Sequence, residues 1–189
     1  MRAQYTGDMS AGDVTAAHPA RIDRVLDAQH PYFYLSENTT LINPRLSTWT
    51  GMVTAASGKL KLQVPWTAKQ VRVVTEICDG GPEELIEHYD DVIEFGYRSA
   101  TGSAAVLDWS QTLMSPVDLP GPGDYCLRYH VRDLSRESEE AGIERGPMAE
   151  ALVQLWPSKL SEKKELRITG TFGNFWHPGS RLRSVWDGL

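Results

Sequence analysis

The sequence lacks most of the patterns that identify a catalytic or metal-binding protein. It contains two cysteines, Cys78 and Cys126. These are too few for a disulfide scaffold or a zinc site of paired cysteines, and we expect both to be thiols. The five histidines show no H-x-H or H-x-x-x-H spacing, and no glycine-rich phosphate loop or G-x-S-x-G nucleophile elbow is present. We therefore expect no metal, no cofactor and no catalytic residue.

The sequence also lacks a long apolar run. No window approaches the roughly 18 consecutive apolar residues of a membrane-spanning helix, and residues 1–20 have no apolar core of the kind a secretory signal needs. We therefore expect a cytoplasmic protein that makes no membrane contact. Hydrophobic residues make up 41% of the chain, too many for a disordered protein. The formal net charge of -6 argues against nucleic acid as a general partner.

Alternating apolar residues predict strands through the middle of the chain. The pattern is present in residues 32–37, 59–65, 70–77, 91–99 and 103–109. Because the connections are short, we expect 59–65 to lie antiparallel to 70–77, and 91–99 to form a hairpin with 103–109.

The two longest strand patterns lie within residues 117–157, where we expect a pair of strands at the edge of a sheet. Side chains alternate between the faces of a strand, so one set points to the core and the other to a polar face. The expected core set is Tyr125, Leu127, Tyr129 and Val131, and the expected outward set is Cys126, Arg128, His130 and Arg132. The outward set is an alternative functional surface, since Arg128 and His130 would lower the pKa of the Cys126 thiol. Residues i and i+4 of a strand lie about 13 Å apart, so a nucleophilic cysteine would need a base from another strand.

Together these patterns predict a mainly β protein, a single antiparallel β-sandwich or open barrel of about seven to nine strands with short terminal helices. The expected helices are residues 21–29 and 158–164. We expect residues 1–20 to be a flexible N-terminal segment, 21–165 the sandwich and 166–189 an extension in which aromatic residues alternate with arginines. That extension either covers the sandwich or binds a partner, and single-stranded nucleic acid is one candidate because bases stack on aromatic rings.

Charge is distributed unevenly along the chain. Residues 76–94 carry eight acids and no lysine or arginine. Such a run is most often a solvated loop, but its negative potential would also speed encounter with a basic protein and imitate a phosphate backbone. The predicted partner-binding residues are Glu83, Glu84, Glu87, Asp90, Asp91 and Glu94. A second acidic run, residues 137–144, would extend the same patch.

Three segments resemble a family of bacterial β proteins. They read Tyr-Asp-Asp-Val-Ile-Glu at 89–94, Gly-Asp-Tyr-Cys-Leu-Arg-Tyr-His-Val-Arg at 123–132 and Glu-Ala-Leu-Val-Gln-Leu-Trp-Pro at 150–157. The layout is similar to that of competence protein J-like nuclease inhibitors and immunity-type proteins of toxin systems. The resemblance implies a β-sandwich that neutralises or escorts a protein partner, and it implies no catalytic residue. Cys126 stands where the family pattern has a basic residue, and the segment after Trp156 lies outside the pattern.

The favoured hypothesis is a non-catalytic immunity or nuclease-inhibitor-like module whose acidic surface binds a basic protein, a toxin or a nuclease. Two alternatives stay open. One is a small hydrolase with a Cys/His site or a metal site built from His88, Asp90, Asp91 and His130. The other is a ligand- or single-stranded nucleic-acid-binding protein that uses residues 166–189.

Overall fold

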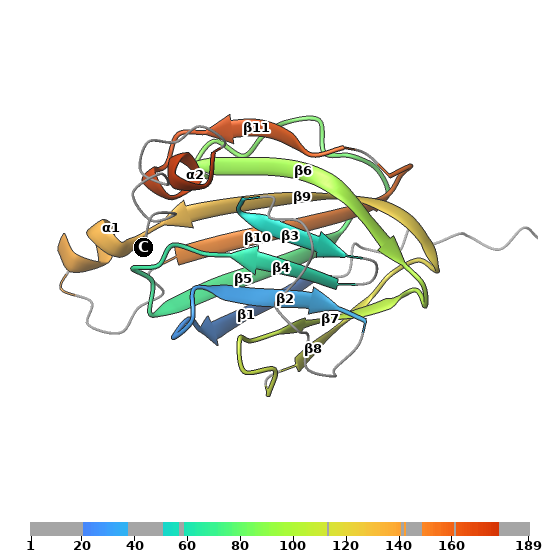
Figure 1. The fold of residues 1–189 in the computed structure, drawn as a ribbon, viewed down its shortest axis with the longest axis horizontal. Helices are drawn as coiled ribbons and strands as arrows, with labels where there is room; N and C mark the ends of the chain where they lie inside the picture. Colours follow the sequence, from blue (N-terminus) through green and yellow to red (C-terminus); the bar gives the residue numbers. More distant parts are fainter. Residues whose placement is uncertain are drawn as a thin grey trace, which may run out of the picture.

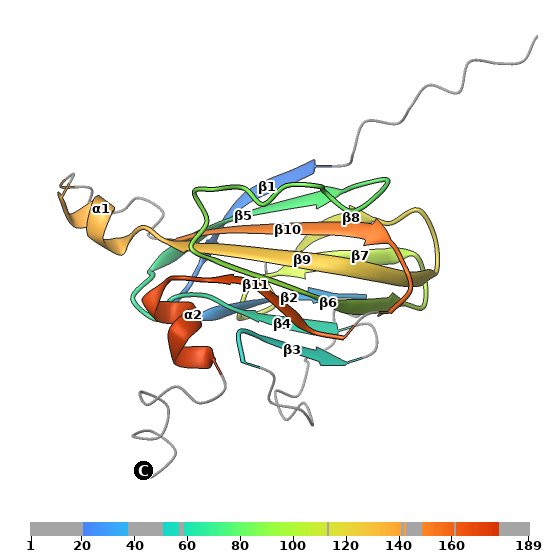
Figure 2. The ribbon, with the colours of Figure 1, turned by 90° about the horizontal axis from the view of Figure 1, so that it is seen from above.

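The chain folds into two β-sheets packed face to face, as the computed structural model shows (Figures 1 and 2). The structure describes residues 21–37, 51–56, 59–112, 114–140, 142, 149–160 and 162–177. These residues form eleven strands and two short helices. The predicted β-sandwich is therefore confirmed, whereas the expected flexible segment 1–20 lies outside the described residues.

One sheet has six strands and the other has five. The six-stranded sheet runs in the order β1 (Arg21–Asp27), β5 (Gln70–Ile77), β10 (Ala149–Pro157), β9 (Gly123–Asp133), β6 (Asp91–Ser99) and β11 (Lys164–Ile168). The five-stranded sheet runs β3 (Val53–Ala56), β4 (Lys59–Gln63), β2 (Tyr32–Ser36), β7 (Ser103–Leu107) and β8 (Met114–Asp118). The helices are α1 (Ser135–Glu140) and α2 (Thr171–Trp176), which lie at the same end of the molecule in both views (Figures 1 and 2).

The predicted pairing of β9 with β10 is confirmed, but these strands are the two central strands of their sheet and not an edge pair. β10 runs parallel to β5, so the sheet is mixed and not wholly antiparallel. Two local pairings were wrong. β4 and β5 lie in different sheets, as do β6 and β7, because each short connection carries the chain across the sandwich instead of back along one sheet.

Both predicted helices were also wrong. Residues 21–27 form β1, which pairs along its whole length with β5 and buries Leu26. The described part of 158–164 contains no helical residue, and residues 164–168 form β11 against β6. The expected C-terminal extension thus begins inside a strand of the sheet. Neither helix of the described residues is long and apolar enough to cross a membrane.

The main core lies between the sheets. The predicted inward set of β9 is confirmed, since all four of its members are at most 3% exposed and belong to this core. Tyr129 also ties the two sheets together, because its hydroxyl donates to the Gln63 carbonyl at 2.6 Å.

The other face of β9 is buried as well, so the prediction of an exposed polar face was wrong for three residues. Cys126 is 5% exposed, Arg128 7% and His130 0%. Arg128 and His130 contact the loop between β5 and β6, residues 78–90, which we call the acidic loop. A second, smaller core forms beneath it from Val74, Tyr89, Val92 and Leu152, with Leu85 and Ile86 packed against them. Arg132, at the end of the strand, stays partly exposed and pairs with Glu137 at 2.6 Å.

Candidate protein-binding surface

The acidic loop is held from below by two arginines. Nη1 of Arg167, on β11, donates to the carbonyl oxygens of Ile86, Glu87 and Tyr89 at 2.9, 3.2 and 3.0 Å. Nη1 of Arg128, on β9, donates to the carbonyl oxygen of Glu84 at 3.3 Å. The contacts bind the backbone of the loop and leave its carboxylates free to face the solvent.

The six predicted partner-binding acids fall into two groups. Glu83, Glu84 and Glu87 are exposed, and none of them forms an ion pair with another described residue. Asp90, at the end of the loop, is partly buried. Asp91 and Glu94 point into the protein and are 1% and 9% exposed, because each has an internal partner.

Asp91 anchors α2. Its carboxylate accepts hydrogen bonds from the backbone N–H groups of Thr169, Gly170 and Gly173 at 3.1, 2.9 and 2.9 Å. Burial raises the pKa of the Asp91 carboxyl, and the three N–H groups only partly offset that effect. Asp91 is therefore a structural acid that fixes the short helix to the start of β6.

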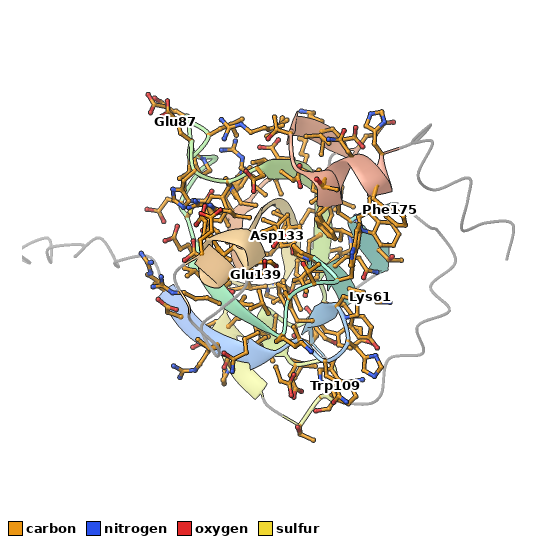
Figure 3. All side chains as sticks on the ribbon, turned by 90° about the vertical axis from the view of Figure 1, so that its left-hand side faces the viewer. Lys61, Glu87, Trp109, Asp133, Glu139 and Phe175 are labelled. Atoms are coloured by element: carbon orange, nitrogen blue, oxygen red, sulfur yellow. The ribbon has the colours of Figure 1, made fainter. Side chains whose placement is uncertain are left out.

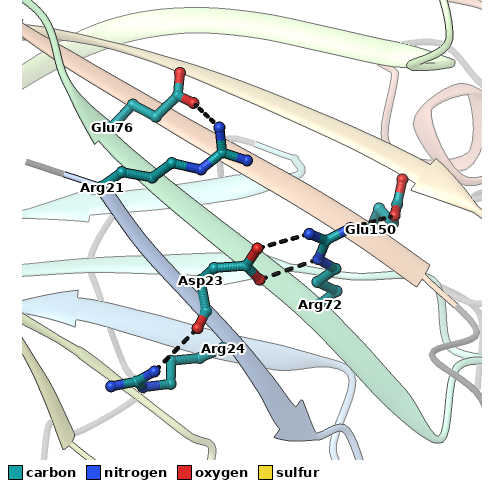
Figure 4. A network of polar contacts seen from close by, with 6 residues as sticks. All are labelled: Arg21, Asp23, Arg24, Arg72, Glu76 and Glu150. Atoms are coloured by element: carbon teal, nitrogen blue, oxygen red, sulfur yellow. Dashed lines mark hydrogen bonds and ion pairs between the residues drawn. The ribbon is translucent and has the colours of Figure 1, made fainter. Parts of the chain in front are cut away.

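The neighbouring part of the same sheet face is electrically neutralised. Across β1, β5 and β10, Arg72 pairs with Asp23 at 2.6 Å and with Glu150 at 3.5 Å (Figure 4). Arg21 pairs with Glu76 at 3.2 Å. Glu76 belongs to the acid-rich segment of the sequence but has its counter-ion here. The uncompensated negative charge of this face is consequently concentrated on the acidic loop.

The alternative catalytic residues are in surroundings that oppose their proposed roles. Burial lowers the pKa of His130 to about 4, and its Nε2 lies 3.1 Å from Oε1 of Gln154. Cys126, the proposed nucleophile, is only 5% exposed, so its thiol is hidden from a substrate in solution. Among the described residues, no three His, Cys, Asp or Glu side chains are placed to share a metal ion.

The predicted C-terminal aromatic surface is only partly described. Phe172 is 4% exposed and belongs to the main core, while Phe175 and Trp176 are partly buried in α2. Arg181, Arg183 and Trp186 lie outside the described residues. Sequence reasoning placed Arg167 in the C-terminal extension and did not identify it as a support of the acidic loop.

Comparison with known proteins identifies a fold relationship. No family model and no curated protein matches the chain. Among solved structures, the chain is similar to crocagin biosynthetic gene J (15% identity, 75% of this chain and 98% of that chain, TM-score 0.48). It is also similar to ComJ of Bacillus subtilis, an inhibitor of the DNA degrading activity of NucA, with 13% identity over 75% of this chain and 100% of that chain and a TM-score of 0.55. The resemblance seen in the sequence is thus confirmed at the level of the fold.

Proposed function

We propose that this protein is a non-catalytic binding module that inhibits or escorts a basic protein, such as a nuclease, through the carboxylates of its acidic loop. The observation that carries the proposal is the attachment of the loop backbone to Arg128 and Arg167. A solvated connection between two strands needs no such attachment, whereas a binding loop benefits from it.

The benefit is energetic. Ordering a mobile loop on binding costs roughly 0.5–1.5 kcal/mol for each immobilised side chain, and pre-ordering the loop reduces that cost. Glu83, Glu84 and Glu87 then present three unpaired negative charges from a fixed backbone. Such a surface accelerates encounter with a positively charged protein and disfavours neutral or acidic ones. The fold shared with a nuclease inhibitor is compatible with this role.

The proposal is tested with a basic DNA-degrading endonuclease from the same cell. We expect the protein to reduce DNA cleavage and to associate at a rate that falls steeply between about 50 and 300 mM NaCl, since the Debye length shortens over that range. The variant Glu83→Gln/Glu84→Gln/Glu87→Gln should fold normally but associate at least about tenfold more slowly at low salt.

A matched control removes the same charge elsewhere. Asp27, Asp118 and Glu162 are exposed acids on β1, on β8 and before β11. The variant Asp27→Asn/Asp118→Asn/Glu162→Gln should associate within about twofold of the wild-type rate, because steering depends on where the charge lies. Equal slowing in the two variants, or binding that does not depend on salt, would contradict the proposal.

A further inference from the structure

A groove opens at the end of the sandwich where α1 and α2 lie. Its volume is about 430 Å³. It is lined by Pro65, Asp90, Asp91, Val131, Asp133, Ser135, Glu139, Thr169, Gly170, Thr171 and Phe172. We call it the end groove. Figure 3 looks onto this end of the molecule, with Asp133 and Glu139 near the centre and Phe175 to one side.

The lining of the end groove carries negative charge without a counter-ion. It includes four acids and no lysine or arginine, and three of the acids, Asp90, Asp133 and Glu139, are at least partly exposed, whereas Asp91 is buried. None of these four acids forms an ion pair with a described residue, in contrast to Asp23, Glu76, Glu94 and Glu150, which all do. The neighbouring sheet face is neutralised by its own arginines, but the end groove is not. A cation from outside would therefore find favourable potential here.

Two of the groove acids, Asp133 and Asp90, are also held in place by hydrogen bonds. Oδ1 of Asp133 accepts hydrogen bonds from the backbone N–H of Ser135 at 3.0 Å and from its hydroxyl at 2.6 Å. Oδ2 of the same residue accepts from the Thr67 hydroxyl at 3.3 Å. Oδ2 of Asp90 accepts from the backbone N–H of Asp133 at 3.4 Å. Two loops and the start of α1 thus fix the carboxylates of Asp133 and Asp90 before any partner arrives.

An exposed aromatic side chain borders the groove. Trp66, which follows the lining residue Pro65, is 51% exposed, the largest exposed fraction among the exposed large hydrophobic residues of the described chain. Its ring lies 4.9 Å from that of Phe175 and 6.2 Å from that of the lining residue Phe172. Tryptophan is among the commonest anchors of protein interfaces, and its face also stacks on arginine.

We infer that the end groove is a docking site for an arginine-bearing loop of a basic protein partner, with the guanidinium among Asp90, Asp133 and Glu139 and the adjoining apolar part of the loop against Trp66. An arginine is the expected occupant because its positive charge complements the carboxylates of the groove. A planar guanidinium can donate to several carboxylates at once and stack on the indole.

The inference rests on the proposed function for the identity of the partner, but not for the site. Asp90 is both the last residue of the acidic loop and part of the groove lining. A partner steered by Glu83, Glu84 and Glu87 would meet the groove at the same end of the loop. The loop would then contribute mainly to the association rate, and the buried contacts at the groove mainly to the dissociation rate.

The test uses the full chain and a short peptide probe, the capped sequence Gly-Gly-Arg-Leu-Gly-Gly, with a Glu-for-Arg peptide as the control. Amide chemical-shift mapping at low salt should show saturable shifts at residues 66–67, 133–139 and 169–172, with a Kd of about 1 mM or below. The control peptide should produce none. Shifts confined to residues 83–87 would overturn the inference.

Variants then separate the groove from the loop. Asp133→Asn/Glu139→Gln should weaken peptide binding at least about tenfold, and Trp66→Ala at least about fivefold, because they remove the charges and the stacking surface. Glu83→Gln/Glu84→Gln removes the same number of charges from the acidic loop and, compared at about 150 mM salt, where the Debye length is only about 8 Å, should bind the peptide within about twofold of wild type. Thermal unfolding of each variant checks the fold.

The two proposals can fail independently. If a nuclease binds through the acidic loop while the groove variants leave its Kd unchanged, the groove inference is wrong and the proposed function stands. If no basic nuclease binds but the peptide maps to the groove and is lost on Trp66→Ala, the groove inference stands and the nuclease assignment is wrong.

Discussion

The Arg128 guanidinium donates from Nε to the Glu94 carboxylate at 2.8 Å, and its Nη2 lies 2.7 Å from the same oxygen. The two side chains are only 9% and 12% exposed. The guanidinium also lies 5.5 Å from the centre of the Trp156 ring, which is covered in turn by Gly81 of the acidic loop. Glu94 is therefore part of the packing beneath the loop, unlike the exposed acids Glu83, Glu84 and Glu87 of the same acid-rich segment.

Removing one partner of this pair should destabilise the protein strongly. We expect Glu94→Gln to lower the free energy of unfolding by about 3–5 kcal/mol, because it leaves the Arg128 charge buried and uncompensated. Replacing both partners, as Glu94→Leu/Arg128→Met, should recover much of the loss. Urea unfolding measures both changes. Glu84→Gln, on the exposed part of the loop, is the control and should stay within about 0.5 kcal/mol of wild type.

His130 should make stability depend on pH. The side chain is fully buried. Burial lowers its pKa to about 4, and the charges of Arg128, Arg167 and His88 add to the effect, while the hydrogen bond with Gln154 opposes it. In the unfolded chain the pKa is about 6.5. Between these values the unfolded state binds more protons than the folded state, so stability is complete above about pH 6.5 and falls as the pH is lowered toward 4.

The size of the effect is limited by linkage to about 1.4 kcal/mol per pH unit in that window. Urea unfolding of the wild type and of His130→Gln at several pH values between about 7 and 5 isolates the contribution of His130. The contributions of the other titrating groups cancel when the two free energies of unfolding are subtracted. Asp91 is one such group, and its raised pKa acts in the opposite direction. A wild-type-minus-variant difference that does not change with pH would show that His130 is not buried in its neutral form.

Seven of the strands were predictable because they have a face of alternating apolar residues, whereas β1, β3, β8 and β11 were not predicted. On the core face, β4 carries Leu60 and Leu62, β5 carries Val71 and Val73, and β9 carries Leu127 and Tyr129. All six side chains are at most 1% exposed. Residues 21–27 were assigned to a helix because their apolar residues also fit helical spacing in so short a segment. The segment forms a strand because it pairs with β5, which lies more than 40 positions later in the chain.

The burial of the second face of β9 was not predictable either, because it also depends on a segment that is distant in the sequence. Cys126, Arg128 and His130 have the polarity of a solvent-facing row, and only the loop that packs over them makes that face interior. The acidic loop itself could be recognised from its lack of lysine and arginine. Its attachment could not, since Arg167 reaches carbonyl groups about 80 positions earlier in the chain, and no periodicity encodes such a contact.

Gly173 should be required for the attachment of α2. A Cβ atom at this position would lie 2.4 Å from Cγ of Asp91, well inside contact distance, in a site where the carboxylate is fixed by three N–H groups. We expect Gly173→Ala to reduce the free energy of unfolding by about 1–3 kcal/mol through overpacking. Gly80→Ala is the control, because a Cβ there meets no atom within 4 Å. Comparable losses in the two variants, measured by thermal unfolding, would mean that α2 is not held by Asp91.

Arg167 should determine how rigid the acidic loop is. Replacing it as Arg167→Met removes the donor shared by the carbonyl groups of Ile86, Glu87 and Tyr89 while keeping the loop's own carboxylates. Since a lost hydrogen bond from a charged donor costs about 1–3 kcal/mol, hydrogen–deuterium exchange at residues 83–90 should accelerate about tenfold to a hundredfold. Arg98→Met is the matched control, because Arg98 pairs only with Asp124 on the exposed surface. In the Arg98→Met variant, residues 83–90 should exchange at the wild-type rate.

If the acidic loop must be ordered to bind, Arg167→Met will also slow association with a basic partner, although every acid in the loop is intact. Unchanged exchange at 83–90 in Arg167→Met would show instead that the apolar contacts of Leu85, Ile86 and Tyr89 suffice to hold the loop.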